Sequence, residues 1–197
     1  MPKVTEEHRK ARRLEISQAA LRCFARKGFQ ATSMAEIIAE SGLSAGAIYG
    51  NFKNKEELIG EAVREVTAFH AGRVAAPRED GTLPPPREVV ERFVGVLGEH
   101  FTDFGLLVQI WAEVVTDSSF QHTASTVAAG LRGVFEGYAD TWLRRPGARV
   151  EGDIGVLARR YGAVMLGVCQ GFIVQSALFR DFDAGNYLSG LEILQLP

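Results

Sequence analysis

The chain has 197 residues, of which 46% are hydrophobic and 23% are charged, and its formal net charge is −2. This composition excludes a disordered or a fibrous protein. The charge is unevenly divided, because residues 1–55 contain ten Lys and Arg against five Glu, whereas residues 56–197 contain twelve basic against nineteen acidic residues. A basic first part on an acidic remainder predicts a polyanionic partner at one end of the molecule.

The first helix is predicted from Arg9 to Lys27. Apolar residues recur from Ile16 onward at the spacing of one buried stripe, and Gly28 ends the pattern. Cys23 lies on this stripe, and the second cysteine, Cys169, lies far away in another apolar pattern. Two separate buried thiols favour a reducing cytoplasm. The N-terminal segment lacks the apolar run of a signal peptide. We therefore expect a cytoplasmic protein.

Three helix starts follow one another closely in the next part of the chain. Ser33, with a Glu three residues later, has the spacing of a capping box, and the helix that it begins should end at Gly42. Ser44 and Asn54 are N-caps for a second short helix and for a longer third one. Two capped helices across a glycine-containing turn form a helix-turn-helix, although such a pair can also serve only as core.

The same stretch carries a series of small, aromatic and basic residues: Gly28, Phe29, Thr32, Ser33, Ile37, Ile38, Gly42, Leu43, Ser44, Gly46, Ile48, Tyr49, Asn51, Phe52, Lys53 and Lys55 to Leu58. This series resembles the N-terminal signature of the TetR family of bacterial transcriptional regulators, over about residues 9–70. The resemblance implies a DNA-binding head, a connecting helix, and a body that dimerises and binds a small molecule. Ligand binding would then reposition the two heads so that they no longer fit successive major grooves. Asn51 replaces the family's usual His or Tyr, which leaves its role open.

The resemblance and the helix positions together indicate how DNA would be held. Helix N-termini, hydroxyl groups and lysines bind phosphates. The recognition helix beginning at Ser44 has no Arg or Gln that could read bases, so affinity should come mainly from phosphates, with DNA shape adding selectivity. The basic segment from Arg9 to Arg13 is either a solvated face or a further surface along the DNA. The expected DNA-binding residues are Thr32, Ser33, Ser44, Ala45, Gly46, Tyr49, Lys53 and Lys55.

A linker is predicted at residues 75–86, which contain four of the seven prolines and no apolar period. It divides the chain into a helix-turn-helix domain at residues 1–54, a connecting helix at 55–73, and a ligand-binding and dimerisation domain at 75–197. No stretch shows strand alternation, so the fold class is all-α with about nine helices. The helices expected in the body are Arg87–His100, Leu106–Val115, Ser119–Arg144, Glu151–Phe179 and Tyr187–Leu194.

The segment Tyr161–Phe179 contains nineteen uncharged residues, close to the length of a membrane span. The glutamines within it favour instead a helix that is buried on several sides, and the membrane span is the alternative. The resemblance places this segment in the four-helix bundle of a homodimer, formed by roughly residues 155–195. The expected interface residues are Gly167, Gly171, Gln175, Tyr187, Leu191 and Leu194.

Aromatic and methionine side chains of the body line a ligand pocket or simply build the core, because both show helical spacing. Polar residues within apolar runs are the stronger signal, since a buried polar group must be paired. Gln109, Glu113, His122, Gln170 and Gln175 are such residues, and each fits an interface or the surface as well as a pocket. The pocket residues that we expect are Phe104, Trp111, Glu113, Phe135, Tyr138, Trp142, Met165 and Gln170.

The chain contains no GxSxG, HExxH, CxxC or glycine-rich phosphate-loop motif, and its four histidines fall singly. We therefore expect no catalysis, no cofactor and no metal. The predicted function is that of a sequence-specific transcriptional repressor, which a small-molecule inducer releases from a palindromic operator in double-stranded DNA. The alternatives are a DNA-binding regulator without an effector and an all-α enzyme.

Overall fold

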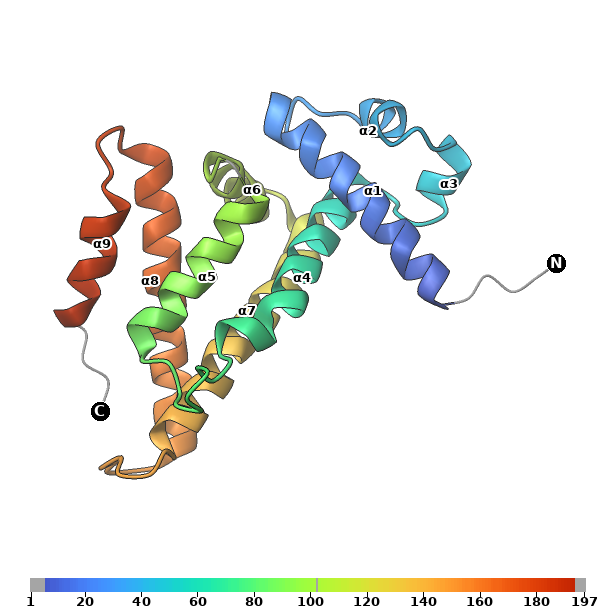
Figure 1. Cartoon of the computed structure of the whole chain (residues 1–197). Coiled ribbons are helices and arrows are strands. Elements are labelled where there is room, and N and C mark those ends of the chain that lie inside the picture. Colours follow the sequence, from blue (N-terminus) through green and yellow to red (C-terminus); the bar gives the residue numbers. More distant parts are fainter. Residues whose placement is uncertain (1–5, 102, 194–197) are drawn as a thin grey trace. The chain divides into compact units, whose positions relative to one another are not determined.

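The computed structural model describes residues 6–101 and 103–193, and within these residues the regular structure is entirely helical (Figure 1). The predicted all-α fold and its nine α-helices are confirmed, and a short 3-10 helix, η1, follows the last of them. The helices are α1 (Glu6–Lys27), α2 (Met34–Ser41), α3 (Ala45–Tyr49), α4 (Lys55–Val74), α5 (Pro86–His100), α6 (Gly105–Thr116), α7 (Ser118–Leu143), α8 (Ile154–Leu178), α9 (Ala184–Gly190) and η1 (Leu191–Ile193).

The chain forms two compact units. The first contains the residues up to Glu65 together with Gln109–Val127, and the second contains Val66–Val108 together with the residues from Ala128 onward. The division passes through α4, α6 and α7, so each of these helices contributes to both units. The domain limits expected from the sequence follow the chain continuously, whereas the compact units do not.

In the first unit, α1 packs against α2, and α2 is followed closely by α3 (Figure 1). Ion pairs at the C-terminal end of α1 reinforce this packing. Glu40 on α2 accepts from Arg22 at 2.8 Å and from Arg26 at 2.6 Å, and Glu36 pairs with Lys27. The core residues of this unit, each at most 1% exposed, include Ile16, Phe24, Phe29, Ile37, Ile48, Phe52, Leu58 and Ile59.

In the second unit, α8 lies between α5 and α9 (Figure 1). Phe172 of α8 is the centre of an aromatic cluster, with ring centroids 5.1 Å from Phe182, 5.4 Å from Tyr187 and 6.1 Å from Phe104. The Tyr187 hydroxyl donates to the carbonyl oxygen of Val168 at 2.8 Å. These contacts hold α9 on α8.

The first helix begins at Glu6 instead of the predicted Arg9. Two further predicted starts, those of α8 and α9, were also wrong by three residues, and these two errors have the same cause. The helix α8 begins at Ile154 instead of Glu151, because the Asp153 carboxylate accepts from the Val156 N–H and caps the helix. The last helix begins at Ala184 instead of Tyr187, because Asp183 caps it in the same way. An aspartate before a helix satisfies free N–H groups of the first turn, and the apolar spacing alone does not reveal it.

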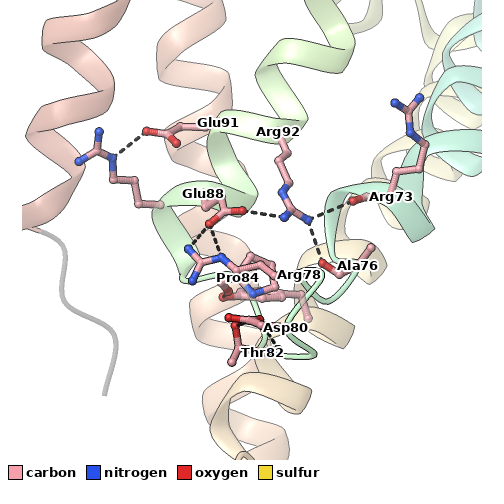
Figure 2. Close-up of polar contacts among 11 residues, drawn as sticks. Arg73, Ala76, Arg78, Asp80, Thr82, Pro84, Glu88, Glu91 and Arg92 are labelled. Atoms are coloured by element: carbon pink, nitrogen blue, oxygen red, sulfur yellow. Dashed lines mark hydrogen bonds and ion pairs between the residues drawn. The ribbon is translucent and has the colours of Figure 1, made fainter.

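The predicted linker is tied to its surroundings by a network of charged side chains (Figure 2). The Arg92 guanidinium of α5 donates to the carbonyl oxygens of Ala76, at 2.8 Å, and Arg73, at 3.4 Å, just where α4 ends. Glu88 accepts from Arg92 at 2.6 Å and also pairs with Arg78 of the linker. The network therefore supplies hydrogen bonds to a segment that has no regular structure of its own.

The helix α8 is long and apolar enough to cross a membrane by length and composition, with a mean hydropathy of 1.4 over its most apolar 18 residues, of which 28% are buried. At two of its glycines, an added Cβ atom would lie closer than 3.0 Å to another atom of the chain. A Cβ atom on Gly162 would lie 2.8 Å from the backbone nitrogen of Glu136 on α7, and one on Gly171 would lie 2.8 Å from the Tyr187 hydroxyl. Gly167 has open space beside it.

Candidate nucleic-acid interface

The caps that the sequence predicts for the two short helices are confirmed. Ser33 accepts from the Glu36 N–H at 3.3 Å, and the Glu36 carboxylate accepts from the Ser33 N–H at 2.9 Å, which completes a capping box. Gly42 ends α2 in the left-handed conformation, with φ 67°. The Ser44 hydroxyl then accepts from the Ala47 N–H at 3.2 Å and begins α3. The geometry of a helix-turn-helix is thus set by local hydrogen bonds.

The face of α3 that points to solvent is small and nearly uncharged. Ala45 and Gly46 are exposed, and the Tyr49 side chain is 54% exposed, whereas Ile48 is completely buried. We call the exposed residues Ser44, Ala45, Gly46 and Tyr49 the α3 face. It offers mainly backbone groups and the hydroxyl groups of Ser44 and Tyr49, and such a surface suits phosphate contact and shape recognition better than base reading.

Two residues expected to contact DNA make hydrogen bonds inside the first unit. Thr32 is only 2% exposed, and its hydroxyl donates to the Gly28 carbonyl oxygen at 2.8 Å. The Lys55 ammonium donates to the carbonyl oxygens of Phe29, at 3.0 Å, and Gln30, at 3.1 Å, and lies 4.7 Å from the centroid of the Phe29 ring. The remaining six expected residues are exposed: Ser33, Ser44, Ala45, Gly46, Tyr49 and Lys53.

The residue whose role the sequence left open has a structural function. The Asn51 side-chain amide donates to the Ala47 carbonyl oxygen at 2.8 Å and so satisfies the end of α3. The Arg13 guanidinium donates to the Asn51 carbonyl oxygen at 2.7 Å, pairs with Glu61 at 2.9 Å and lies 4.2 Å from the centroid of the Phe52 ring. Arg13, one of the basic residues at the start of α1, therefore joins α1 to α4.

The capping box at Ser33 predicts a pH dependence of stability. The side-chain hydrogen bond from Lys27, followed by those from Ser33, lowers the pKa of Glu36 from its ordinary value of 4.5 to about 2. Because the pKa is lower in the folded state, the contribution of Glu36 to stability is present above pH 4.5 and is lost as the pH falls toward 2. Urea unfolding at pH 7 and at pH 3 should show a smaller stability difference for Glu36→Gln than for the wild type. Equal differences in the two proteins would contradict this role.

The eight residues expected to form a pocket do not belong to one unit. Trp111 and Glu113 lie in the segment that belongs to the first unit, and the other six lie in the second. In the second unit, Phe135, Tyr138 and Met165 are buried, and Gln170 is exposed. The Tyr138 and Trp142 rings stack with centroids 6.1 Å apart. These aromatic residues thus have partners within the core.

A hollow of about 240 Å³ lies beside the linker, in the second unit. Tyr138 is the one expected pocket residue on its wall, and the Tyr138 hydroxyl donates to the Pro84 carbonyl oxygen at 2.7 Å. Ligand sites usually have volumes of about 300–1,000 Å³, so this hollow is small for that purpose. Its lining residues are Ala75, Leu83, Val134, Gly137, Tyr138 and Thr141.

Within residues 6–101 and 103–193, no three His, Cys, Asp or Glu side chains are grouped so that they could hold a metal ion. Cys23 and Cys169 are buried free thiols. Burial raises the pKa of both, so the thiolate form is disfavoured.

Comparison with known proteins gives a match to the first unit. Residues 16–62 match the family described as bacterial regulatory proteins, tetR family. The chain is 38% identical over 88 residues, 45% of its own length, to the uncharacterized HTH-type transcriptional regulator YerO of Bacillus subtilis, of which the match covers 30%. The chain spans about a third of the length of the first curated relatives that it matches.

Solved structures resemble the chain over nearly its whole length. The Salmonella enterica protein GusR aligns with a TM-score of 0.69 at 24% identity, covering 98% of this chain and 96% of GusR. The transcriptional regulator FadR of Bacillus subtilis, solved in complex with stearoyl-CoA, aligns with a TM-score of 0.62 at 19% identity, covering 91% of this chain and 96% of FadR. At these identities the likeness concerns the fold.

Proposed function

We propose that this chain, a member of the tetR family of bacterial regulatory proteins, is a cytoplasmic transcriptional regulator that binds double-stranded DNA through α2 and α3. The observation that carries the proposal is the α3 face, which the capped turn between the two helices presents to solvent. Tyr49 of this face, together with the exposed Ser33 and Lys53, offers the hydroxyl and ammonium groups that hold phosphates. In this proposal α3 makes few contacts to DNA bases, and contacts to the phosphates of the DNA backbone supply most of the affinity.

The proposed regulator acts as a homodimer. Val156, Val164 and Leu178 are 36%, 53% and 62% exposed, and their spacing places them on one face of α8 together with Gly167. An apolar helix face of this length is usually covered by another protein surface. A second copy of α8 would cover it, and the open space beside Gly167 would let the two helices approach closely. Of the other expected interface residues, Leu194 lies outside the described residues.

A small-molecule effector is part of the proposal, and the regulator is then a repressor that its ligand releases from DNA. FadR, a structural neighbour at 19% identity, was solved with stearoyl-CoA, which supports testing acyl-CoA thioesters first. The hollow beside the linker is too small for such a ligand, so binding would require the second unit to open. The alternative is a regulator without an effector.

The test uses duplexes selected from a random pool by the full-length protein, with affinity measured by fluorescence anisotropy. We expect a palindromic site with half-sites about one helical turn apart. Inserting 5 base pairs between the half-sites should weaken binding at least about 100-fold, because it turns one half-site to the opposite face of the duplex. Tyr49→Phe should weaken binding by roughly fivefold, the effect of one hydrogen bond. Tyr161→Phe, a change in the second unit, is the matched control.

Failure to select any duplex above the random pool would overturn the proposed function. A second arm adds stearoyl-CoA, shorter acyl-CoA thioesters, lipophilic cations and antibiotics to the protein–DNA complex. Release of DNA together with a raised melting temperature supports the ligand-gated repressor. If no compound releases DNA or raises the melting temperature, the ligand-gated repressor is rejected in favour of a regulator without an effector.

A further inference from the structure

The glutamine in the apolar run of α6 has a specific partner in the first unit. Gln109 Oε1 accepts from the Phe29 N–H at 3.2 Å. It also approaches Gly28 so closely that a Cβ atom there would lie 2.8 Å from the same oxygen. Gly28 has φ 80°, a conformation that favours glycine, so both its backbone angle and the nearby amide suit a residue without a side chain.

The Phe29 N–H needs this acceptor because of how α1 ends. The Gly28 N–H already donates to the Phe24 carbonyl oxygen at 2.7 Å, and the chain then turns away from the helix. Phe29 is only 1% exposed. A buried N–H without a partner costs free energy. The Gln109 amide supplies the partner from a distant part of the chain.

Four helices meet at the same turn, which we call the Phe29 turn and define as residues 28–32. The Phe29 ring lies 5.2 Å from that of Phe24 on α1, and it stacks at 5.8 Å on that of Phe120 on α7. Lys55 of α4 covers the ring and donates to carbonyl oxygens of the turn. With Gln109 of α6, the Phe29 turn joins the start of α4 to segments more than 50 residues further along the chain.

The Phe29 turn leads directly into the DNA-binding helices. Thr32, its last residue, donates from its hydroxyl to the Gly28 carbonyl oxygen, and Ser33 then caps α2. The direction in which α2 leaves the turn is therefore fixed by the residues that hold the turn. Only the short turn at Gly42 separates α2 from the α3 face. The orientation of α2 therefore also determines the orientation of the α3 face.

We infer that Gln109 is a positioning residue for DNA binding, because its hydrogen bond to Phe29 fixes the turn from which α2 starts. The inference rests on the proposed function. Phe29 and Gln109 both belong to the first unit, so the contact ties the start of α2 to α6 within that unit.

The test compares three variants of the full-length protein. Gln109→Met keeps the length of the side chain and removes the acceptor, whereas Gln109→Glu keeps an acceptor oxygen at the same place. Gln121→Met, at an exposed glutamine of α7 in the same unit, is the control. Gln109 is itself exposed, so the substitutions should leave the fold intact, which circular dichroism checks. Should Gln109→Met fail to fold, Gln109→Ala removes the acceptor by shortening the side chain.

Hydrogen exchange of the Phe29 amide is the direct readout. Gln109→Met should raise its exchange rate at least about fivefold and weaken DNA binding about two- to tenfold, the range for one hydrogen bond. Gln109→Glu should restore both, and Gln121→Met should change neither. A purely structural role would instead lower the melting temperature of both Gln109 variants without a selective change at Phe29. Wild-type exchange in Gln109→Met overturns the inference.

The exchange measurement requires no DNA, so it separates this inference from the proposed function. If the wild type binds no selected duplex, the proposed function fails, and the inference that Gln109 positions the DNA-binding helices fails with it. If the wild type binds DNA and Gln109→Met binds equally well, only the inference is overturned.

Discussion

Lys55→Met is expected to lower the free energy of unfolding by about 2 kcal/mol, because hydrogen bonds from a charged donor contribute roughly 1.5–3 kcal/mol. The Lys55 ammonium donates to three carbonyl oxygens of the Phe29 turn, those of Phe29, Gln30 and Thr32, and lies over the Phe29 ring. Methionine fills a similar volume and donates to none of these carbonyl groups. Urea unfolding followed by circular dichroism measures the change.

Lys53→Met is the matched control, because Lys53 is two residues away and its side chain is exposed. Its stability should equal that of the wild type, while its affinity should fall for every DNA sequence. The slope of log affinity against log salt concentration should decrease in size by about one, as expected for the loss of one phosphate contact. Equal stability of both variants would show that Lys55 does not hold the turn, and an unchanged salt slope for Lys53→Met would remove it from the interface.

Gly162→Ala should destabilise the second unit by about 2 kcal/mol, the typical cost of adding a methyl group where there is no room. The added Cβ would meet the backbone nitrogen and the Cγ of Glu136 at 2.8 Å and its Cα at 3.0 Å. Because two of these atoms belong to the backbone of α7, the two helices must separate. This cost exceeds the gain of up to about 1 kcal/mol that alanine brings to a helix.

Gly133→Ala provides the contrast, since a Cβ atom there meets nothing within 4 Å. It lies in α7, outside the face of α8 proposed to dimerise, and should stabilise the protein by up to about 1 kcal/mol. Thermal and urea unfolding of both variants give the comparison. A Gly162→Ala protein as stable as the wild type would mean that α7 and α8 are not in close contact at this point.

The sequence alone predicted the parts of the site that depend on local hydrogen bonds. The Ser33 capping box, the Ser44 cap and the left-handed Gly42 each involve residues no more than a few positions apart, so spacing is sufficient to identify them. The start of α9 shows the limit of apolar spacing, because Asp183, whose cap decides it, lies outside the apolar pattern.

The partners of individual side chains depend on tertiary contacts, which the sequence alone does not predict. Thr32 and Lys55 have the residue types of a phosphate site, but the sequence does not reveal that Thr32 is buried or that both residues donate hydrogen bonds to carbonyl oxygens of the turn. Gln109 was recognisable as a polar residue in an apolar run, but its partner lies 80 residues away. The expected pocket met a similar limit, because aromatic residues at helical spacing look the same whether they line a cavity or fill a core.

The first unit has a consequence for how DNA-binding heads can be exchanged between related proteins. It is assembled from two separate stretches of the chain, the residues up to Glu65 and Gln109–Val127. A graft that cuts the chain once, after Glu65, transfers the recognition helices without the ring of Phe120 that stacks on Phe29. Grafted heads will therefore keep their native geometry only when the second stretch is transplanted with them.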